Sequence, residues 1–416
     1  MIGKKIYELA CKLWPLNRSL TGEGNRETLK LISEHIPNLK IKSVSSGKKV
    51  FDWTVPKEWL VNEAYIETPN GKKICDFKKN NLHLVGYSIP FNGVLPLNKL
   101  KEYIHTLPDQ PNAIPYVTSY YQEKWGFCLS KNELDLLEEG NYKVKVDTKL
   151  FDGQMNYAEI ILPGRSSNEV FLSSYICHPS MANNEISGPT VLTYLTKWLQ
   201  DLENREFTYR IIFIPETIGS ITYLSQNLDS MKKNIIAGFN LSCLGDDRSY
   251  SYLPSRNGKT ISDEVAKHVL KWTDPNFIKY TWLDRGGDER QYCAPGIDLP
   301  IASIFRTKHG AYPEYHTSLD NLKDVVNPKG LDGGYWVIRK ALELLEKNKK
   351  YETTVLGEPK FQKRNLTKDK LTQDFISICD GKTSLLDISN ILNVPCWELY
   401  DLVSKLKSLE LIKEVN

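Results

Sequence analysis

Two histidines and two glutamates stand in polar segments of this 416-residue sequence, each close to a run of apolar residues. His178 follows an apolar, β-prone run, and Glu185 lies shortly before an amphipathic helical segment. Glu216 follows a second apolar run, and His316 lies in a later polar loop. Imidazole and carboxylate groups bind zinc, and an open zinc site needs three such ligands and a vacant position for water. A carboxylate outside that ligand set can accept the proton of the water, so these residue types point to metal-assisted hydrolysis.

The segments around these residues alternate between strands and helices. Apolar runs predict strands at 169–176, 209–214, 235–243 and 300–305, and helical periodicity covers 194–202, 221–228, 262–272 and 334–347. Such alternation predicts a mostly parallel sheet with right-handed crossovers. Ligands of open α/β sheets bind outside the carboxyl ends of the strands. Four polar segments are expected at that edge, at 177–185, 215–220, 287–292 and 313–320.

The N-terminal part of the chain has a different pattern of predicted secondary structure. Residues 2–35 predict two helices, and the polar run at 17–22 either joins them as a plain loop or closes over the site. Between residues 44 and 130, short β-like runs alternate with proline and Asn-Gly signals, which predicts a small inserted β-rich domain. The main domain is then expected to comprise residues 1–43 and 131–350.

Aromatic residues are dense in the inserted domain. We assign Trp53, Trp59 and Trp125 to its core rather than to a ligand platform. The two alternating runs that follow, at 142–150 and 155–162, are expected to be strands of the main domain.

The end of the chain has a third character. Residues 348–370 are charged and lack periodicity, as expected of a linker, and residues 356–416 predict three short helices and a terminal ribbon that resemble a winged helix. The latter segment has nine basic and nine acidic residues. A DNA-reading domain normally presents a basic face, so we expect no nucleic-acid binding. Docking within the chain or in a homo-oligomer is the expected role, and the oligomeric state stays open.

The composition is that of an ordinary globular protein, with 41% apolar and 25% charged residues and a net charge of +3. This near balance gives no reason to expect bulk binding to nucleic acid or to a membrane. No apolar run approaches the ~18 residues of a membrane-spanning helix, and the N-terminus lacks the features of a signal peptide. The eight cysteines are scattered without a CxxC pair, which favours free thiols and a cytoplasmic location.

The order of the four polar segments resembles a known superfamily. The sequence reads His, then Asn-Asn-Glu-x-Ser-Gly, Pro-Glu-Thr-x-Gly-Ser and Tyr-His-Thr-x-x-Asp, and this order is similar to that of the zinc aminopeptidases. The resemblance is strongest to a bacterial aminopeptidase-like branch and spans nearly the whole chain. It implies a three-layer α/β/α zinc-exopeptidase-like catalytic domain with an inserted β-rich domain and a C-terminal winged-helix-like domain. Members of the branch are often found among genes for surface polysaccharide or modified-sugar assembly.

The resemblance also implies roles for individual residues. His178 matches the first metal histidine of the superfamily, His316 the last, and Glu216 the general base. Three positions depart from the two-zinc pattern, because Thr217, Asn184 and Ser242 replace anionic ligands. We therefore expect one zinc ion, held by His178, His316 and either Glu185 or Asn184, and charge balance favours Glu185.

Other residues in the same loops have weaker claims. Asp288 could orient a ligand histidine as a hydrogen-bond acceptor, or form a structural ion pair within its own loop. Arg290 could hold a substrate carboxylate or phosphate with its planar fork. Tyr315, beside His316, is a further candidate for substrate contact, whereas His309 is expected to be an inert, solvent-facing loop residue.

The leading hypothesis is a zinc-dependent, aminopeptidase-like hydrolase of an amide or peptide bond in a small-molecule or short peptide-like substrate. An alternative keeps the metal and the base but forms amides or transfers acyl groups. A third possibility is a non-catalytic ligand-binding or regulatory protein with a degenerate site. Retention of Glu216 between the two histidine segments argues against the third hypothesis.

Overall fold

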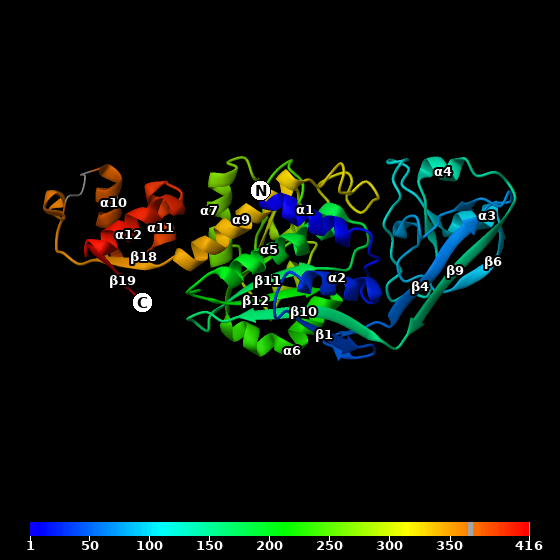
Figure 1. The fold of residues 1–416 in the computed structure, drawn as a ribbon, viewed down its shortest axis with the longest axis horizontal. Coiled ribbons are helices and arrows are strands. Elements are labelled where there is room, and N and C mark those ends of the chain that lie inside the picture. Colours follow the sequence, from blue (N-terminus) through cyan, green and yellow to red (C-terminus); the bar gives the residue numbers. More distant parts are fainter. Residues whose placement is uncertain (365–368, 416) are drawn as a thin grey trace.

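A mixed eight-stranded sheet forms the centre of the protein in a computed structural model that describes residues 1–364 and 369–415 (Figure 1). In chain order its strands are β1 (Lys40–Ser45), β10 (Gln154–Leu162), β11 (Glu169–Tyr175), β12 (Thr208–Ile214), β13 (Ile235–Asn240), β14 (Ser251–Leu253), β15 (Ile278–Lys279) and β16 (Ile301–Phe305). Their order across the sheet is β1-β10-β12-β11-β13-β16-β14-β15. The central strands β12, β11, β13 and β16 are parallel, as the alternation of strands and helices predicted.

Side chains of the central strands alternate between two hydrophobic cores. Val170 and Leu172 of β11 belong to one core, whereas Phe171 belongs to the other. The first core is covered by α1 (Ile2–Leu13), α2 (Glu23–Ser33), α5 (Ser187–Asp201), α7 (Ile261–Thr273) and α9 (Pro328–Lys347), and the second by α6 (Ile218–Asn234) (Figure 1). A sheet buried on both faces has near-continuous apolar strands, as observed here. The predicted three-layer α/β/α class is confirmed.

A second, four-stranded sheet forms the body of the inserted module, at the right in Figure 1. Its strands are β4 (Glu58–Glu67), β5 (Lys73–Ile74), β6 (Phe91–Pro96) and β9 (Asn141–Phe151), in the order β5-β4-β9-β6. Two small strand pairs accompany it: the antiparallel hairpin of β2 (Lys49–Val50) with β3 (Trp53–Thr54), and the parallel pair of β7 (Ile104–His105) with β8 (Phe127–Cys128).

The placement of two strands differs from the sequence-based expectation. The strand predicted at 142–150 exists as β9, but it pairs with β4 and β6 of the smaller sheet, not with the main sheet. Conversely, β1 crosses residue 44 and pairs with β10 at the edge of the main sheet. Alternation identifies the buried face of a strand, but it does not identify the sheet that the strand joins.

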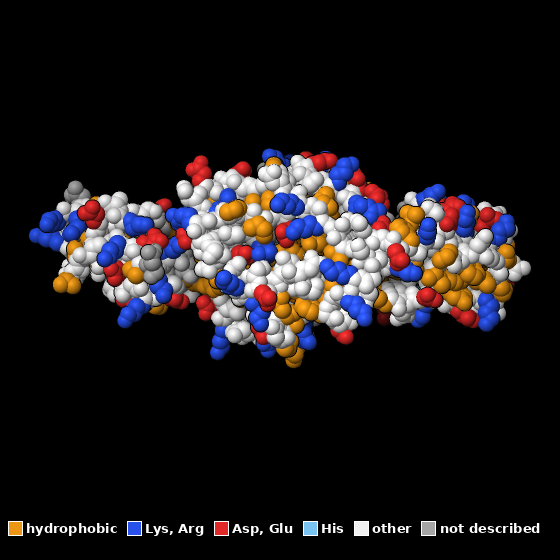
Figure 2. Space-filling view, turned by 90° about the horizontal axis from the view of Figure 1, so that it is seen from below, with side chains coloured by type: hydrophobic (Ala, Val, Ile, Leu, Met, Phe, Trp, Pro, Cys, Tyr) orange, Lys and Arg blue, Asp and Glu red, His pale blue; other side chains and the backbone are white. Residues whose placement is uncertain are grey.

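The C-terminal segment folds as a small helical unit at the left of Figure 1. Its elements are β17 (Lys350–Thr353), α10 (Lys370–Ile378), β18 (Asp380–Ser384), α11 (Leu385–Leu392), α12 (Tyr400–Ser408) and β19 (Ile412–Val415), with the sheet order β18-β17-β19. Strand β17 lies inside the predicted linker at 348–370, of which 365–368 fall outside the described residues. Lys, Arg, Asp and Glu side chains are interspersed on this unit in the view of Figure 2.

The C-terminal unit packs on the α/β domain rather than standing apart. Its apolar residues continue the first hydrophobic core. His268 of α7 bonds Asn390 through Nδ1 (2.8 Å) and accepts the backbone N–H of Cys396 at Nε2 (3.0 Å). Throughout the part of the chain that the structure describes, no helix combines the length and apolar character needed to cross a bilayer.

Candidate active site

His178 stands just beyond the carboxyl end of β11, in a buried loop. Its Nδ1 lies 2.8 Å from Oε2 of Glu185, which belongs to a π-helical turn, Ala182–Ile186, in front of α5. Since Nδ1 is engaged by a carboxylate, Nε2 is the ring nitrogen that remains open, and it lies 3.6 Å from Oε2 of Glu216. A histidine held by a carboxylate through its other nitrogen has the orientation that metal-binding imidazoles require.

Glu185 is fixed by a second charged residue, Arg18, from the N-terminal segment. The guanidinium Nε of Arg18 donates to Oε1 of Glu185 at 2.7 Å, and its NH2 donates to the carbonyl of His178 at 2.9 Å. The backbone N–H of His178 donates to Oε2. Both carboxylate oxygens are therefore occupied, and the Arg18–Glu185 pair is almost completely buried. The polar run at 17–22, predicted either as a plain loop or as a segment that closes over the site, thus supports the site through Arg18.

Asn184, the predicted alternative to Glu185 as a ligand, has a different environment. Its Oδ1 accepts a hydrogen bond from the hydroxyl of Tyr175 at 3.2 Å, and its Nδ2 is buried without a hydrogen-bond partner. The Oγ of Ser242 is likewise buried without a partner. Asp320 accepts the backbone N–H groups of Asn183 (2.7 Å) and Asn184 (3.0 Å) and so fixes the turn. Asn184 and Ser242 are uncharged side chains, so neither position supplies an anionic metal ligand.

Glu216 follows β12 and begins the turn into α6. Its backbone N–H donates to Sγ of Cys177 at 3.1 Å, and the next residue, Thr217, has a φ of +63°. Burial raises the pKa of Glu216 above its ordinary value, although His178 and Arg290 oppose the shift. A carboxylate with a raised pKa is better matched to proton transfer near neutral pH than an exposed glutamate is.

The third polar segment supports this turn from behind. Oδ1 of Asp288 accepts the backbone N–H of Thr217 (2.7 Å) and the hydroxyl of Ser220 (2.8 Å). Asp288 is completely buried, and burial together with the charge of Glu216 raises its pKa to about 8. The structure therefore places Asp288 behind Glu216, where it holds the left-handed Thr217 in position. It contacts neither histidine by a described hydrogen bond.

Arg290 comes from the same segment but faces the opening. Its NH2 donates to Oγ1 of Thr217 at 2.8 Å and lies 3.7 Å from Oε1 of Glu216. The side chain is 41% exposed, so most of its donors can reach a ligand. This position agrees with the predicted contact to a substrate anion.

His316 completes the group from the fourth segment. Its φ is +56°, and its ring centroid lies 5.4 Å from that of His178. The ring stacks on Tyr315 at a centroid distance of 3.9 Å. Burial and the neighbouring His178 lower the pKa of His316 to about 3, and its Nε2 is buried without a hydrogen-bond partner. A neutral imidazole with a free nitrogen is the form that binds metals.

The inserted module packs an aromatic ring against both histidines. Tyr116 lies 5.3 Å from the ring of His178 and 5.1 Å from that of His316, measured between centroids. Its backbone N–H donates to the carbonyl of His316 at 2.9 Å. A bridge between Pro115 and Thr317 joins the same two segments. Thus a loop of the module is bonded directly to the loop that carries His316.

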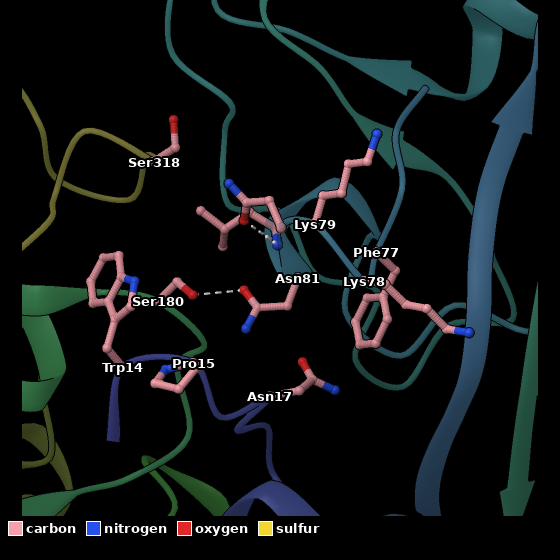
Figure 3. Close-up of a pocket in the computed structure, with 11 residues that line it drawn as sticks. Trp14, Pro15, Asn17, Phe77, Lys78, Lys79, Asn81, Ser180 and Ser318 are labelled. Atoms are coloured by element: carbon pink, nitrogen blue, oxygen red, sulfur yellow. Dashed lines mark hydrogen bonds between the residues drawn. The ribbon is translucent and has the colours of Figure 1, made fainter. Parts of the chain in front are cut away.

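A cavity of about 290 Å³ opens onto His178, Glu216 and Arg290, whereas His316 does not line it. Its lining comprises Leu20, Trp53, Tyr120, Tyr121, Cys177, His178, Glu216, Thr217, Ile218 and Arg290. A larger cavity, of about 350 Å³, lies beside the loop that follows β11 (Figure 3). Ser180 of this loop donates a hydrogen bond to Asn81 there, and the side chains of Trp14, Phe77 and Lys78 form walls of the cavity. None of the candidate catalytic groups lines that larger cavity, so we take the smaller one as the active-site pocket.

The residues at this pocket can be tested for their fit to zinc. Within the described ranges, one buried group of potential ligand atoms lies within 4.8 Å of one another, formed by Cys177, His178 and Glu185. Burial raises the pKa of the Cys177 thiol well above its ordinary value, and both oxygens of Glu185 already accept hydrogen bonds. The open nitrogens of His178 and His316, with Glu216 close by, are the better match to an open site.

Several functional residues were not predicted from the sequence. Arg18 lies in the polar run at 17–22, which was considered as a segment that closes over the site. No sequence pattern predicts its ion pair with Glu185. Tyr116 stands in the aromatic-rich part of the inserted domain, and no role was predicted for it. Trp53, also assigned to that core, is 40% exposed and lines the pocket, whereas Trp59 is buried as predicted. His309 is not solvent-facing as expected but buried, with its ring against Gly286.

The fold defines the class of protein. The structure is similar to that of BSAP, a zinc aminopeptidase from Bacillus subtilis, with a TM-score of 0.61, 13% identity and coverage of 82% of this chain and 94% of that one. A peptidase M28 precursor from Shewanella amazonensis gives a TM-score of 0.58 at 13% identity, with coverage of 83% and 96%. At such identities the likeness shows a shared aminopeptidase fold. The predicted aminopeptidase-like fold is confirmed.

The chain belongs to the family described as "Domain of unknown function (DUF4910)", which it matches over residues 7–348. Residues 349–414 match a winged helix-turn-helix family, which confirms the predicted winged helix. A relative from Clostridium acetobutylicum, named a putative polysaccharide biosynthesis protein with aminopeptidase-like domain, is 40% identical over 399 residues, covering 93% of this chain and 91% of that protein. The crystal structure of a putative peptidase from Clostridium acetobutylicum is 39% identical, with a TM-score of 0.95 and coverage of 100% and 97%.

Proposed function

We propose that this protein is a zinc-dependent hydrolase of an amide bond. The observation that carries the proposal is the meeting of two imidazoles, one buried (His178) and one partly buried (His316), each with an open Nε2, with the partly buried carboxylate of Glu216. His178 and His316 would supply two of the three protein ligands of one zinc ion through these nitrogens, and the third ligand is not assigned. A zinc ion bound there supplies Lewis acidity, which polarises a carbonyl oxygen and lowers the pKa of a water molecule.

The side chains around the ion have separate tasks. Glu216 accepts a proton from water at one carboxylate oxygen and delivers it to the leaving nitrogen. Glu185, the predicted third ligand, would have to give up its bonds to Arg18 and His178 in order to reach the ion. We therefore assign it to fixing the ring of His178, with Arg18 holding the carboxylate in place. Tyr116 and Tyr315 pack against the histidine rings and restrict their movement.

The name of the relative from Clostridium acetobutylicum supports a place in polysaccharide or modified-sugar assembly. The cysteines of the described structure are all free, which supports a reducing compartment, and we retain the cytoplasm as the proposed location. A small-molecule or short peptide-like substrate remains the proposed partner, since the pocket volume is about 290 Å³.

Metal analysis and one isosteric variant test the proposal. Protein purified without chelator is expected to contain about one zinc per chain, and His178→Ala or His316→Ala should abolish this content. Glu216→Gln should keep the zinc and lower kcat by on the order of 10²–10⁴, because the amide cannot accept the proton. Zinc loss in Glu216→Gln would identify Glu216 as a ligand instead. Two tightly bound zinc ions per chain, or hydrolysis that survives the loss of both histidines, would contradict the proposal.

A further inference from the structure

The charged groups of the active-site pocket differ from those that an aminopeptidase substrate needs. Such a substrate carries a free ammonium group next to the scissile carbonyl, and a cation taken out of water requires an anionic or carbonyl partner. Among the residues that line the pocket, the acidic side chain is Glu216 and the basic side chain is Arg290. The open ring nitrogen of His178 is already assigned to the metal. The carboxylate of Glu216 is already assigned to proton transfer.

The other nearby carboxylates are sealed from the pocket. Glu185 is bonded to Arg18 and to the His178 backbone, and it is completely buried. Oε1 of Glu289 accepts the N–H groups of Gly286 and Gly287 (both 2.8 Å), and its Oε2 accepts from Asn240 (3.1 Å). Asp288 is buried behind Thr217, as described above. None of the three carboxylates lines the cavity, so none can pair with an ammonium group bound there.

Arg290 presents the opposite charge to the same space. Its NH2 bonds Thr217, which fixes the guanidinium at the rim, while the side chain remains 41% exposed. A guanidinium has five N–H donors in a planar fork, and most of these are directed to no described protein acceptor. The fork matches the geometry of a carboxylate or a phosphate.

Much of the remaining pocket lining is aromatic and aliphatic. Trp53 is 40% exposed and Tyr121 is 53% exposed, with ring centroids 5.8 Å apart, and the Tyr121 hydroxyl donates to the carbonyl of Thr54. Leu20 and Ile218 line the same pocket. Exposed aromatic rings on a pocket wall favour a ligand with an apolar body.

We propose that the substrate is an N-acylated amide that carries an oxyanion for Arg290 and an apolar group for the Trp53–Tyr121 wall, with no free ammonium next to the scissile bond. This inference rests on the proposed amide hydrolysis and names its substrate class. The protein is then a deacylase of anionic amides and not an aminopeptidase, although it has the aminopeptidase fold. Hydrolysis adds water across the C–N bond, with the hydroxyl going to the acyl carbon and the proton to the leaving nitrogen.

Three ligands that share a leucyl group test this selectivity without requiring turnover. Binding of N-acetyl-L-leucine, N-acetyl-L-leucinamide and L-leucinamide to the full-length, zinc-loaded protein would be measured by calorimetry, and the recovered ligand would be checked by mass spectrometry. The anionic ligand should bind most tightly and the cationic ligand most weakly, with at least about a tenfold difference between them. L-leucinamide binding as tightly as N-acetyl-L-leucine, or no binding of any ligand at about 10 mM, would overturn the proposal.

Two variants and one control assign the preference to residues. Arg290→Gln should remove the advantage of N-acetyl-L-leucine over its neutral amide and leave binding of the neutral amide unchanged. Trp53→Ala should weaken all three ligands by a similar factor. Arg256→Gln is the matched control, because Arg256 forms a half-exposed ion pair with Asp298 and does not line the pocket. A preference that survives in Arg290→Gln would contradict the assigned anion subsite.

The outcomes separate this inference from the proposed function. Binding of the anionic ligand without zinc or hydrolysis would retain the selectivity and refute the hydrolase. Zinc-dependent hydrolysis of L-leucinamide but not of N-acetyl-L-leucine would do the reverse. Competition by inorganic phosphate would identify the oxyanion subsite as one that accepts phosphate, and lack of competition would identify it as a carboxylate subsite; both results support the oxyanion class.

Discussion

The inserted module and the winged helix are both additions to the same α/β domain, but they relate to the active site in opposite ways. The module lies at one end of the long axis and the winged helix at the other (Figure 1). The module packs Tyr116 against both histidine rings and places Trp53 on the pocket wall. The described residues of the winged helix line no part of the pocket, and the unit packs through α7.

This difference follows from where each addition joins the sheet. The module is inserted in the sequence between β1 and β10, two neighbouring strands of the main sheet. Its loops contact the loop of His316 near the carboxyl ends of the parallel strands. The winged helix follows α9. Its apolar residues extend the first hydrophobic core, which α1, α2, α5, α7 and α9 cover. An addition that reaches the carboxyl ends of the strands can shape catalysis, whereas one that extends a helical layer contributes to stability or to contacts with other molecules.

The largest effect is expected from Tyr116→Ala. Removing the ring leaves His178 and His316 free to reorient, so zinc affinity should fall by about 10–100-fold. Competition with a chromogenic chelator measures the affinity. Tyr65→Ala, on the outer sheet of the same module, is the control and should leave zinc binding unchanged. Equal effects of the two variants would mean that Tyr116 acts only through the stability of the module.

A smaller and different effect is expected from His268→Ala, at the contact with the winged helix. The loss of two hydrogen bonds should lower the free energy of unfolding by about 1–3 kcal/mol and leave zinc affinity unchanged. Chemical denaturation and the chelator assay measure the two quantities. A zinc affinity that falls together with the stability would show that the winged helix supports the site.

The same residue gives a pH test of the contact. Burial lowers the pKa of His268, and its Nε2 must stay unprotonated to accept the N–H of Cys396. The stabilisation by neutral His268 is present above the unfolded-state pKa of about 6.5 and declines as the pH falls below it. Wild-type stability should therefore drop more between pH 7 and pH 5 than the stability of His268→Ala does. Identical pH profiles would contradict this account.

The smallest effect on the site is expected from ending the chain after residue 348. The zinc ligands and the pocket lie before this point, so zinc stoichiometry and affinity should be unchanged, although the exposed apolar surface of α9 should lower the thermal midpoint. Loss of zinc from this shortened protein would end the distinction between the two additions.

The full-length protein provides the complementary test of the winged helix. The basic and acidic residues of the winged-helix segment, residues 356–416, are equal in number. Mixed-sequence duplex DNA should therefore show no salt-sensitive binding to the full-length protein in a fluorescence titration. Submicromolar, salt-sensitive binding that disappears in the shortened protein would assign DNA binding to this unit and overturn the expected docking role.

The sequence by itself determined the parts of this protein that depend on local pattern. The apolar run that forms β11, the polar loop of His178 and the periodic α5 are visible in the residues, because strand and helix periods are local properties. The order of the four polar segments was enough to identify the superfamily. The strand-end positions of His178 and Glu216 followed, since parallel strands bring their carboxyl ends to one edge.

Only the tertiary structure decided which groups meet and how they are oriented. The pairing of Arg18 with Glu185 joins residues 167 positions apart, and no periodicity encodes it. The same holds for β9, whose alternation fits either sheet, and for Tyr116, whose aromatic character suits a core as well as an active site. A sequence pattern reports that a side chain is buried on one face. The identity of its partner depends on long-range packing, and that packing turned Glu185 toward His178 Nδ1 and left Arg290 open to the pocket.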